Sequence, residues 1–237
     1  MDYLSGLKGA LSALQGQIPE GTPLFVAGHS EGGLWALEIN RLLPDVFHGV
    51  ILLATAGRSQ CSLVVEQIEA QLKDYQMERS QRDSEIQHLQ QSLQHVARGE
   101  PVSEETLPTL PALRGIVDAY SNPSTADLTR WLCATDPATL LPKDGKSVLI
   151  LQGGYDQQVN ADADAKRLHS AAPGSSLTIA PKADHVLKRL DLDGQPLNIL
   201  HSLKYNQADR QLDPLLTDAL YDWLLQHTEP SPAESPH

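Results

Sequence analysis

The sequence predicts an α/β protein built on a mostly parallel sheet of about four strands with flanking helices. Four short apolar runs, at residues 24–27, 49–54, 147–151 and 176–180, are typical of strands buried on both faces. Segments of good helix formers lie between them, at residues 34–43 and 161–171. Strands that alternate with helices in this way form parallel sheets covered by helices.

The first elements follow from local signals. Residues 3–17 form an amphipathic helix, because their leucines recur with spacings of three and four, at Leu4, Leu7, Leu11 and Leu14. A turn rich in proline and glycine then leads into the first strand. The helix at residues 34–43 ends at Pro44, which cannot continue it. The second strand follows at residues 49–54.

A long insertion separates the second strand from the third. Residues 58–98 contain neither glycine nor proline, and their apolar positions keep a helical period. We expect either one projecting arm or a helix that folds back near Ser80, and we favour a helical cap over a dimerising arm. The predicted core is therefore 1–56 and 143–228, the cap is 57–142 with short helices in its second half, and 229–237 is a disordered tail.

Composition excludes several classes of protein. The chain has 237 residues, of which 41% are hydrophobic, so it can bury a sizeable core and is neither disordered nor fibrous. Its net charge of −12 opposes binding to nucleic acid. It contains no apolar run of the roughly 18 residues that span a bilayer, and no signal peptide follows Met1. We expect a cytoplasmic chain as given, with the compartment of any longer parent unknown.

The cysteines and histidines give no sign of a metal site. Cys61 and Cys133 are 72 residues apart and form no CxxC pair. Two free thiols are the favoured interpretation, and one long-range disulfide stays open. Metal-ligand spacing, a phosphate-binding loop and a dinucleotide fingerprint are all absent from the sequence, so we expect no metal and no cofactor.

The most specific motif is a G-x-S-x-G pentapeptide, Gly28 to Gly32, between a strand and a helix. Such a turn strains Ser30 and raises its hydroxyl above the sheet, and side chains at Gly28 and Gly32 are expected to collide with neighbouring backbone. The backbone N–H of Glu31 then begins a helix, where it can bind a developing oxyanion. These residues predict a nucleophilic serine.

In this context the chain resembles an α/β-hydrolase, whose acid and histidine follow the serine in that order. The resemblance assigns the acid to Asp156, in the Gly-containing loop after the third strand, and the histidine to His185, after the fourth. Asp162 and Asp164 are alternative candidates for the acid, but a simpler interpretation is that they lie early in a helix, where the helix dipole favours acidic residues. His201 is the alternative candidate for the base. His29 is expected to be a packing residue.

The chain departs from the family pattern at its beginning. The resemblance covers the part of the fold from the helix before the nucleophile strand to the end, and the first four strands of the family's sheet have no counterpart. The loop that normally supplies a second oxyanion donor is among the parts without a counterpart. We therefore expect a C-terminal portion of a longer hydrolase, with an exposed sheet edge at Leu24.

The function implied is a serine hydrolase that cleaves small-molecule carboxylic esters through an acyl-enzyme. The strand at 50–54, Glu66-Gln67 and the turn at 151–154 resemble the capped serine-aminopeptidase and monoglyceride-lipase-like branch. Peptidase, thioesterase and acyltransferase activities remain open, because one fold serves them all. A different alternative is a non-catalytic interaction module that self-associates through the sheet edge or the cap helix.

Overall fold

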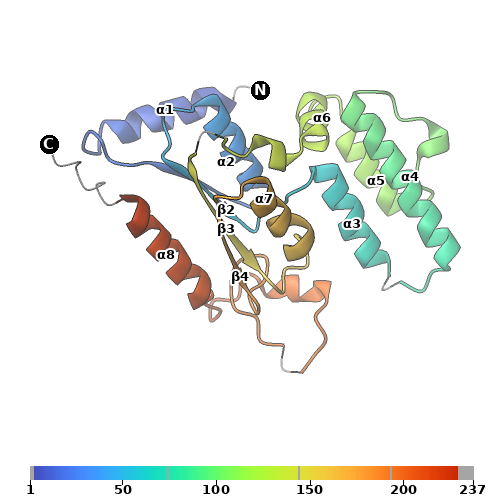
Figure 1. Cartoon of the computed structure of the whole chain (residues 1–237). Helices are drawn as coiled ribbons and strands as arrows, with labels where there is room; N and C mark the ends of the chain where they lie inside the picture. The colour runs from blue at the N-terminus through green and yellow to red at the C-terminus, as the bar shows by residue number, and fades with distance from the viewer. Residues whose placement is uncertain (1–2, 74, 144, 193, 229–237) are drawn as a thin grey trace, which may run out of the picture.

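The computed structural model describes residues 3–73, 75–143, 145–192 and 194–228, and it contains one four-stranded parallel sheet (Figure 1). The strands are β1 (Phe25–His29), β2 (Gly49–Leu53), β3 (Ser147–Gly153) and β4 (Ser176–Ala180), in the order β1-β2-β3-β4. Phe25 pairs with Gly49, Gly49 with Ser147, and Leu149 with Ser176. The predicted strands and their parallel arrangement are confirmed, and β1 forms one edge of this sheet.

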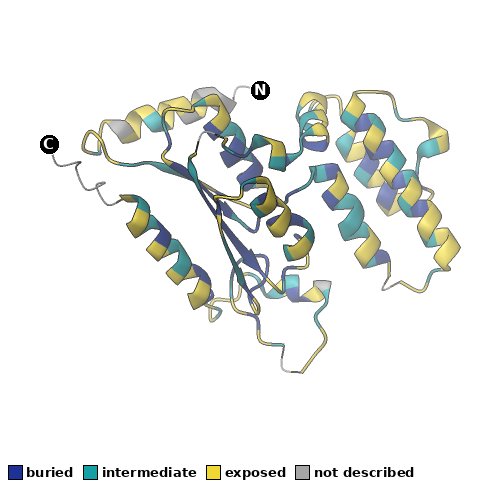
Figure 2. Cartoon of the chain, in the orientation of Figure 1, coloured by how far each residue is buried: buried dark blue, intermediate teal, exposed yellow. Residues whose placement is uncertain are grey.

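Helices cover both faces of the sheet, as a parallel sheet requires. On one face, α2 (Glu31–Leu42) and α7 (Lys166–Ala171) pack against alternate residues of β2 and β3, including Val50, Leu52 and Ile150. On the other face, α8 (Pro214–Thr228) packs its Trp223 against strand residues such as Ile51. The two central strands, β2 and β3, are buried along most of their length, whereas β1 and β4 at the sides of the sheet are only partly buried (Figure 2).

Three further elements lie at the margins of the sheet. The first helix, α1 (Tyr3–Gln15), matches the predicted helix, and its Leu14 is exposed. The predicted helix at 161–171 begins as one turn of π-helix, η3 (Ala161–Ala165), before α7. After β4, a long segment containing the short 3₁₀ helix η4 (Ile199–Lys204) leads to α8. Helix α8 was not among the elements predicted from the sequence.

The insertion folds back on itself and does not project as one long helix. It contains α3 (Gln60–Leu72), α4 (Arg79–Arg98), η1 (Glu104–Thr106), α5 (Pro111–Tyr120), α6 (Ala126–Ala134) and η2 (Pro137–Leu140). Of the two arrangements that the sequence left open, the fold-back near Ser80 is the one observed, and the break lies between Leu72 and Arg79. The break lets α3 pack beside α4, and Leu72, Leu89 and Leu93 are buried in a separate apolar core. Figure 1 shows these helices grouped at one side of the sheet.

A buried carboxylate fixes the start of α5 in this helical segment. Glu85, on α4, is 2% exposed, and its carboxylate accepts hydrogen bonds from the backbone N–H groups of Thr109 and Leu110 and from the Thr109 hydroxyl. These donors lie just before Pro111, where a helix has unpaired N–H groups and a favourable dipole for an anion. Glu85 therefore holds α4 and α5 together.

The interpretation of the two cysteines as free thiols is wrong. Cys61, on α3, and Cys133, on α6, are joined by a disulfide, with their Cα atoms 4.7 Å apart. The packing of α3 against α6 brings the two residues together, which the 72-residue spacing could not reveal. Closing a loop of that length restricts the unfolded chain and stabilises the fold by about 4 kcal/mol in the chain-entropy description.

Two remaining expectations concern membrane-spanning helices and the C-terminal tail. Within the described residues, no helix is long and apolar enough to cross a membrane. The predicted disordered tail, residues 229–237, lies outside the described residues.

Candidate functional site: a hydrogen-bonded Ser30, His185 and Asp156

Ser30 occupies a strained turn between β1 and α2. Its backbone has φ of 55° and ψ of −124°, a conformation that side-chain-bearing residues rarely adopt. The Ser30 N–H donates to the carbonyl of Leu53 on the neighbouring strand, at 2.8 Å, so the turn is tied to the end of β2. Glu31 is the first residue of α2, and its N–H therefore has no acceptor within the helix. The turn has the geometry that the sequence predicts for a nucleophile.

The glycine positions in this turn that have no room for a Cβ atom differ from the predicted pair, Gly28 and Gly32. A Cβ at Gly28 would lie 2.0 Å from the carbonyl oxygen of Gly32, so the steric requirement at Gly28 is confirmed. A Cβ at Gly32 would meet nothing within 4 Å, and the expected collision there is wrong. The close approach is at Gly33, where a Cβ would lie 2.0 Å from Oγ1 of the buried Thr55. Gly32 sits on the outer side of the first helical turn, whereas Gly33 faces the sheet.

This division predicts opposite outcomes for two alanine substitutions. Gly32→Ala is expected to raise the free energy of unfolding by about 0.5–1 kcal/mol, because alanine is a better helix former and meets no neighbour. Gly33→Ala is expected to lower it by about 1–3 kcal/mol, because Thr55 is overpacked. Urea denaturation of both variants measures the difference. Equal effects of the two substitutions would contradict the assignment of the close contact to Gly33.

Asp156 lies in the loop after β3, and its carboxylate is fully enclosed by hydrogen-bond donors. Its Oδ1 accepts from the backbone N–H groups of Gln158, at 2.8 Å, and Val159, at 2.9 Å. Its Oδ2 accepts from Nε2 of Gln152, at 2.9 Å. The side chain of Asp156 has no exposed surface. The same Oδ2 also accepts a bond from His185.

His185 connects Asp156 to Ser30. Its Nδ1 lies 2.9 Å from Oδ2 of Asp156, and its Nε2 lies 3.1 Å from Oγ of Ser30. A carboxylate oxygen can only accept, so Nδ1 carries the proton and Nε2 is left to accept the Ser30 hydroxyl proton. The structure thus brings together the three residues that the sequence predicted, from three separate loops at the carboxyl ends of β1, β3 and β4.

His29 and Tyr205 border this imidazole. Nε2 of His29 donates to the backbone carbonyl of His185, at 2.8 Å, and the two rings are 4.9 Å apart. His29 therefore packs against His185, in agreement with its predicted role. The centre of the Tyr205 ring lies 6.2 Å from that of the His185 ring, and the Tyr205 hydroxyl accepts a hydrogen bond from Nε2 of Gln158. Burial raises the pKa of Tyr205 above its ordinary value.

A buried ion pair holds the loop that carries His185. Asp184 is 1% exposed, and its Oδ1 accepts from the backbone N–H groups of Val186 and Lys188. Its Oδ2 binds Nη2 of Arg210 at 2.5 Å, and this nitrogen also donates to the carbonyl of Lys188. Arg210 lies 26 residues further along the chain, so sequence reasoning could not find this pair.

The rival residues have other roles. Asp162 is exposed and pairs with Lys166. Asp164 is fully buried. Its Oδ1 accepts from Nε of Arg58 at 2.9 Å and from the backbone N–H of Gly57, and its Oδ2 accepts from Nη2 of Arg58 at 2.7 Å. Asp164 lies in the first turn of its helix, as predicted, and its buried pair with Arg58 is a further role that the sequence did not indicate. The hydrogen bond that the Arg58 guanidinium donates to Asp164 raises the pKa of Arg58 above its ordinary value.

His201, the rival base, is buried at η4 and does not contact Ser30. Its Nδ1 lies 3.2 Å from the backbone nitrogen of Asn198 and forms part of a capping box at the start of η4. His201 therefore caps the start of a short helix, and the prediction that favoured His185 over His201 agrees with the geometry.

The space beside Ser30 is small and lies where the helical segment meets the core. The cavity has a volume of about 10 Å³, room for about one water molecule. Its lining comes from the turn, from the loop after β2, and from the helical segment: Ser30, Glu31, Leu34, Thr55, Ala56, Arg58, Gln60, Leu63 and Pro137. Near this cavity two contacts join the core to the helical segment. The rings of Trp35 and Trp131 are tilted against each other, 4.7 Å between their centres, and Nε2 of Gln67 donates to the carbonyl of Gln158.

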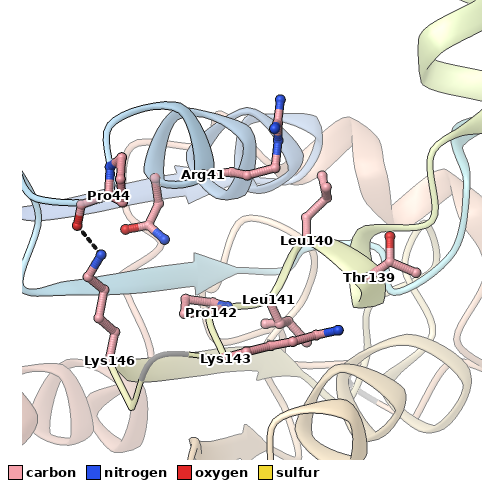
Figure 3. A pocket seen from close by; sticks show the side chains of 9 residues that line it. Arg41, Pro44, Thr139, Leu140, Leu141, Pro142, Lys143 and Lys146 are labelled. Atoms are coloured by element: carbon pink, nitrogen blue, oxygen red, sulfur yellow. Dashed lines mark hydrogen bonds between the residues drawn. The ribbon is translucent and has the colours of Figure 1, made fainter.

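A larger hollow of about 530 Å³ lies at the opposite end of α2 from Ser30 (Figure 3). Three basic side chains line it, but Figure 3 shows Arg41, Lys143 and Lys146 pointing in different directions. Arg41 is bound by Glu38, and Lys146 donates to the carbonyl of Pro44. These cations do not converge on one point, so the site with converging chemistry is at Ser30.

Solved structures with similarity to the chain share little of its sequence. A putative non-heme bromoperoxidase of Mycobacterium tuberculosis is 16% identical, with 95% of this chain and 73% of that chain covered and a TM-score of 0.48. A thermophilic esterase from Thermogutta terrifontis is 18% identical, with coverage of 96% and 71% and a TM-score of 0.45. A monoacylglycerol lipase of Paleococcus ferrophilus is 16% identical, with coverage of 93% and 75% and a TM-score of 0.42.

One family model matches most of the chain. No curated protein sequence matches it. A family model described as serine aminopeptidase, S33, matches residues 1–189. This match includes β1 to β4, the Ser30 turn, Asp156 and His185. The chain therefore belongs to the serine aminopeptidase, S33, family and is a hydrolase of the α/β-hydrolase type.

Proposed function

We propose that the chain hydrolyses carboxylic esters with Ser30 as the nucleophile, His185 as the general base and Asp156 as the acid that orients it. The observation that carries the proposal is the continuous hydrogen-bonded series from Ser30 Oγ through His185 to Asp156, with distances of 3.1 and 2.9 Å. In that arrangement a neutral imidazole can take the hydroxyl proton as the oxygen attacks.

The reaction follows from the positions of these groups. As Ser30 Oγ bonds to the ester carbonyl carbon, its proton moves to Nε2 of His185, and the Glu31 N–H at the start of α2 stabilises the oxyanion. The C–O bond to the alcohol then breaks, and the alcohol leaves with the proton from His185. Water, deprotonated by the same nitrogen, releases the acid and regenerates Ser30.

The helical segment at residues 57–142 is proposed to act as a cap that selects the acyl group. Gln60 and Leu63 on α3 and Pro137 on η2 form one side of the cavity beside Ser30. Because this cavity holds about one water molecule, an acyl chain can enter only when these side chains move away from Ser30. Substitutions at Leu63 should consequently change the preferred acyl length.

A second candidate activity is that of an aminopeptidase, which the family match favours. Ser30, with His185 as its base and Asp156 orienting that base, can also attack an amide carbonyl, because acyl transfer from esters and from amides uses the same catalytic groups. The two candidates differ in the leaving group, an alcohol in one and an amine in the other, so paired substrates distinguish them.

The test uses a fluorophosphonate probe and two substrate series. We expect the purified chain to be labelled covalently, the Ser30→Ala variant to stay unlabelled, and the exposed-serine control Ser124→Ala to label like the wild type. We also expect 4-nitrophenyl esters of short fatty acids to be cleaved faster than amino acid 4-nitroanilides. Faster cleavage of the anilides would favour the aminopeptidase, and a folded wild type that does not label would favour a non-catalytic module.

A further inference from the structure

Gln152, the penultimate residue of β3, is a buried side chain in direct contact with Asp156. It is 0% exposed, and its Nε2 donates to Oδ2 of Asp156 at 2.9 Å. The same Oδ2 accepts from Nδ1 of His185, also at 2.9 Å. One carboxylate oxygen is therefore shared between the glutamine amide and the imidazole.

The surroundings of Gln152 fix which end of its amide faces Asp156. Three acceptors surround Nε2: Oδ2 of Asp156, the carbonyl of Gly153 at 3.3 Å and the carbonyl of Val159 at 3.1 Å. An amide oxygen placed there would face only other oxygens, so the nitrogen must occupy this position. Oε1 of Gln152 is then buried without a partner among the described residues.

An unpartnered buried carbonyl is unfavourable, and an apolar side chain of similar size would avoid it. What glutamine adds at this position is a donor whose shortest bond is to Asp156 and which also bonds the carbonyl of Val159. The other oxygen of Asp156 is already held by the backbone N–H groups of Gln158 and Val159, so the carboxylate does not need Gln152 to keep its place. The donor therefore acts on the charge at Oδ2.

We propose that Gln152 is a positioning residue that limits the negative charge Asp156 presents to His185, and so keeps the imidazole from holding its proton too strongly. This inference rests on the proposed roles of Ser30, Asp156 and His185. A hydrogen bond to a carboxylate oxygen withdraws charge from it, and an imidazole bonded to a less charged oxygen is protonated less readily. A base that accepts the Ser30 proton must be neutral at the working pH.

The other titratable or charged groups that face His185 are unchanged by a substitution at Gln152. His29, on β1, packs against the imidazole with 4.9 Å between ring centres, and the ring of Tyr205, after η4, lies 6.2 Å from it. The Asp184–Arg210 pair lies in the loop next to His185. A change in the titration of His185 in a Gln152 variant therefore reports on Asp156.

The test replaces Gln152 with methionine, which fills similar space without a donor. In Gln152→Met we expect the downfield proton resonance of His185 Nδ1–H to move further downfield. We also expect the midpoint of the acid limb in the plot of kcat/KM against pH to shift to a higher pH by about half to one unit, which is the effect of losing one such hydrogen bond. Below that limb kcat/KM should fall about three- to tenfold, with little change on the plateau.

The matched control is Asn40→Leu. Asn40 is also a buried amide, 4% exposed, whose oxygen has no hydrogen-bond partner in the part of the chain that the structure describes, but it lies near the far end of α2. This variant should change the melting temperature without moving the resonance or the acid limb. A folded Gln152→Met protein whose resonance and acid limb match the wild type, or move in the opposite direction, would overturn the proposal.

The resonance needs no substrate, so the two proposals can fail separately. If the wild type does not react with the fluorophosphonate, the proposed function fails, while the Nδ1–H resonance still measures the effect of Gln152 on the Asp156–His185 bond. If labelling succeeds and the resonance does not respond to Gln152→Met, only the role of Gln152 fails.

Discussion

The Asp156→Asn variant is expected to hydrolyse its ester substrate about 10⁴-fold more slowly than the wild type, at unchanged fold. Asp156 accepts the Nδ1 proton of His185 and leaves Nε2 free for the Ser30 hydroxyl. An asparagine amide can present its N–H₂ to Nδ1, which favours the opposite tautomer and places a proton on Nε2. Stopped-time assays of kcat with a 4-nitrophenyl ester measure the loss.

The matched control for this variant is Asp162→Asn. Asp162 belongs to the same region of the chain, but its side chain is exposed and pairs only with Lys166 among the described residues. We expect this substitution to leave kcat within about twofold of the wild type, because an exposed pair contributes little. A small effect at Asp156 together with a large one at Asp162 would reverse the assignment of the acid.

The Arg210→Met variant is expected to lose about 3–5 kcal/mol of the free energy of unfolding. Arg210 is the charged partner of Asp184 in a pair whose side chains are 8% and 2% exposed. Its guanidinium also donates to the backbone carbonyls of Lys188, Arg189 and Lys204. Methionine fills similar volume but leaves a buried carboxylate unpaired, which is the costly arrangement for an ion pair.

Urea denaturation compares this variant with Arg130→Met, which removes an exposed pair with Asp127 and should change stability by less than about 1 kcal/mol. The double variant Arg210→Met with Asp184→Asn should recover part of the loss, because the unpaired charge is then gone. If Arg210→Met is as stable as Arg130→Met, the buried pair does not hold the His185 loop.

The elements that sequence analysis predicted correctly are those with local signals. The four strands appear as short apolar runs, and the nucleophile turn appears as two glycines around Ser30 between a strand and a helix. Asp156 and His185 were singled out because each follows a predicted strand in the order that the family resemblance requires, and the structure places them within hydrogen-bond distance of each other. The parallel sheet then brings the ends of β1, β3 and β4 to one edge.

The features that were missed depend on contacts between distant parts of the chain. The Cys61–Cys133 disulfide and the Asp184–Arg210 pair join residues 72 and 26 positions apart. The role of Gly33 depends on Thr55, which lies on the loop after the neighbouring strand. The helix α8 was not anticipated because its outer face carries exposed apolar residues, Leu215, Tyr221 and Leu225, that blur its helical period.

The disulfide also has a consequence for how the chain could vary. Cys61 on α3 and Cys133 on α6 lie near the two ends of the helical segment at residues 57–142, and their Cα atoms are only 4.7 Å apart. A gap of that size can be closed by a short turn. The residues between the two cysteines could therefore be shortened, lengthened or exchanged without moving β2 relative to β3, which makes this part of the molecule a modular unit.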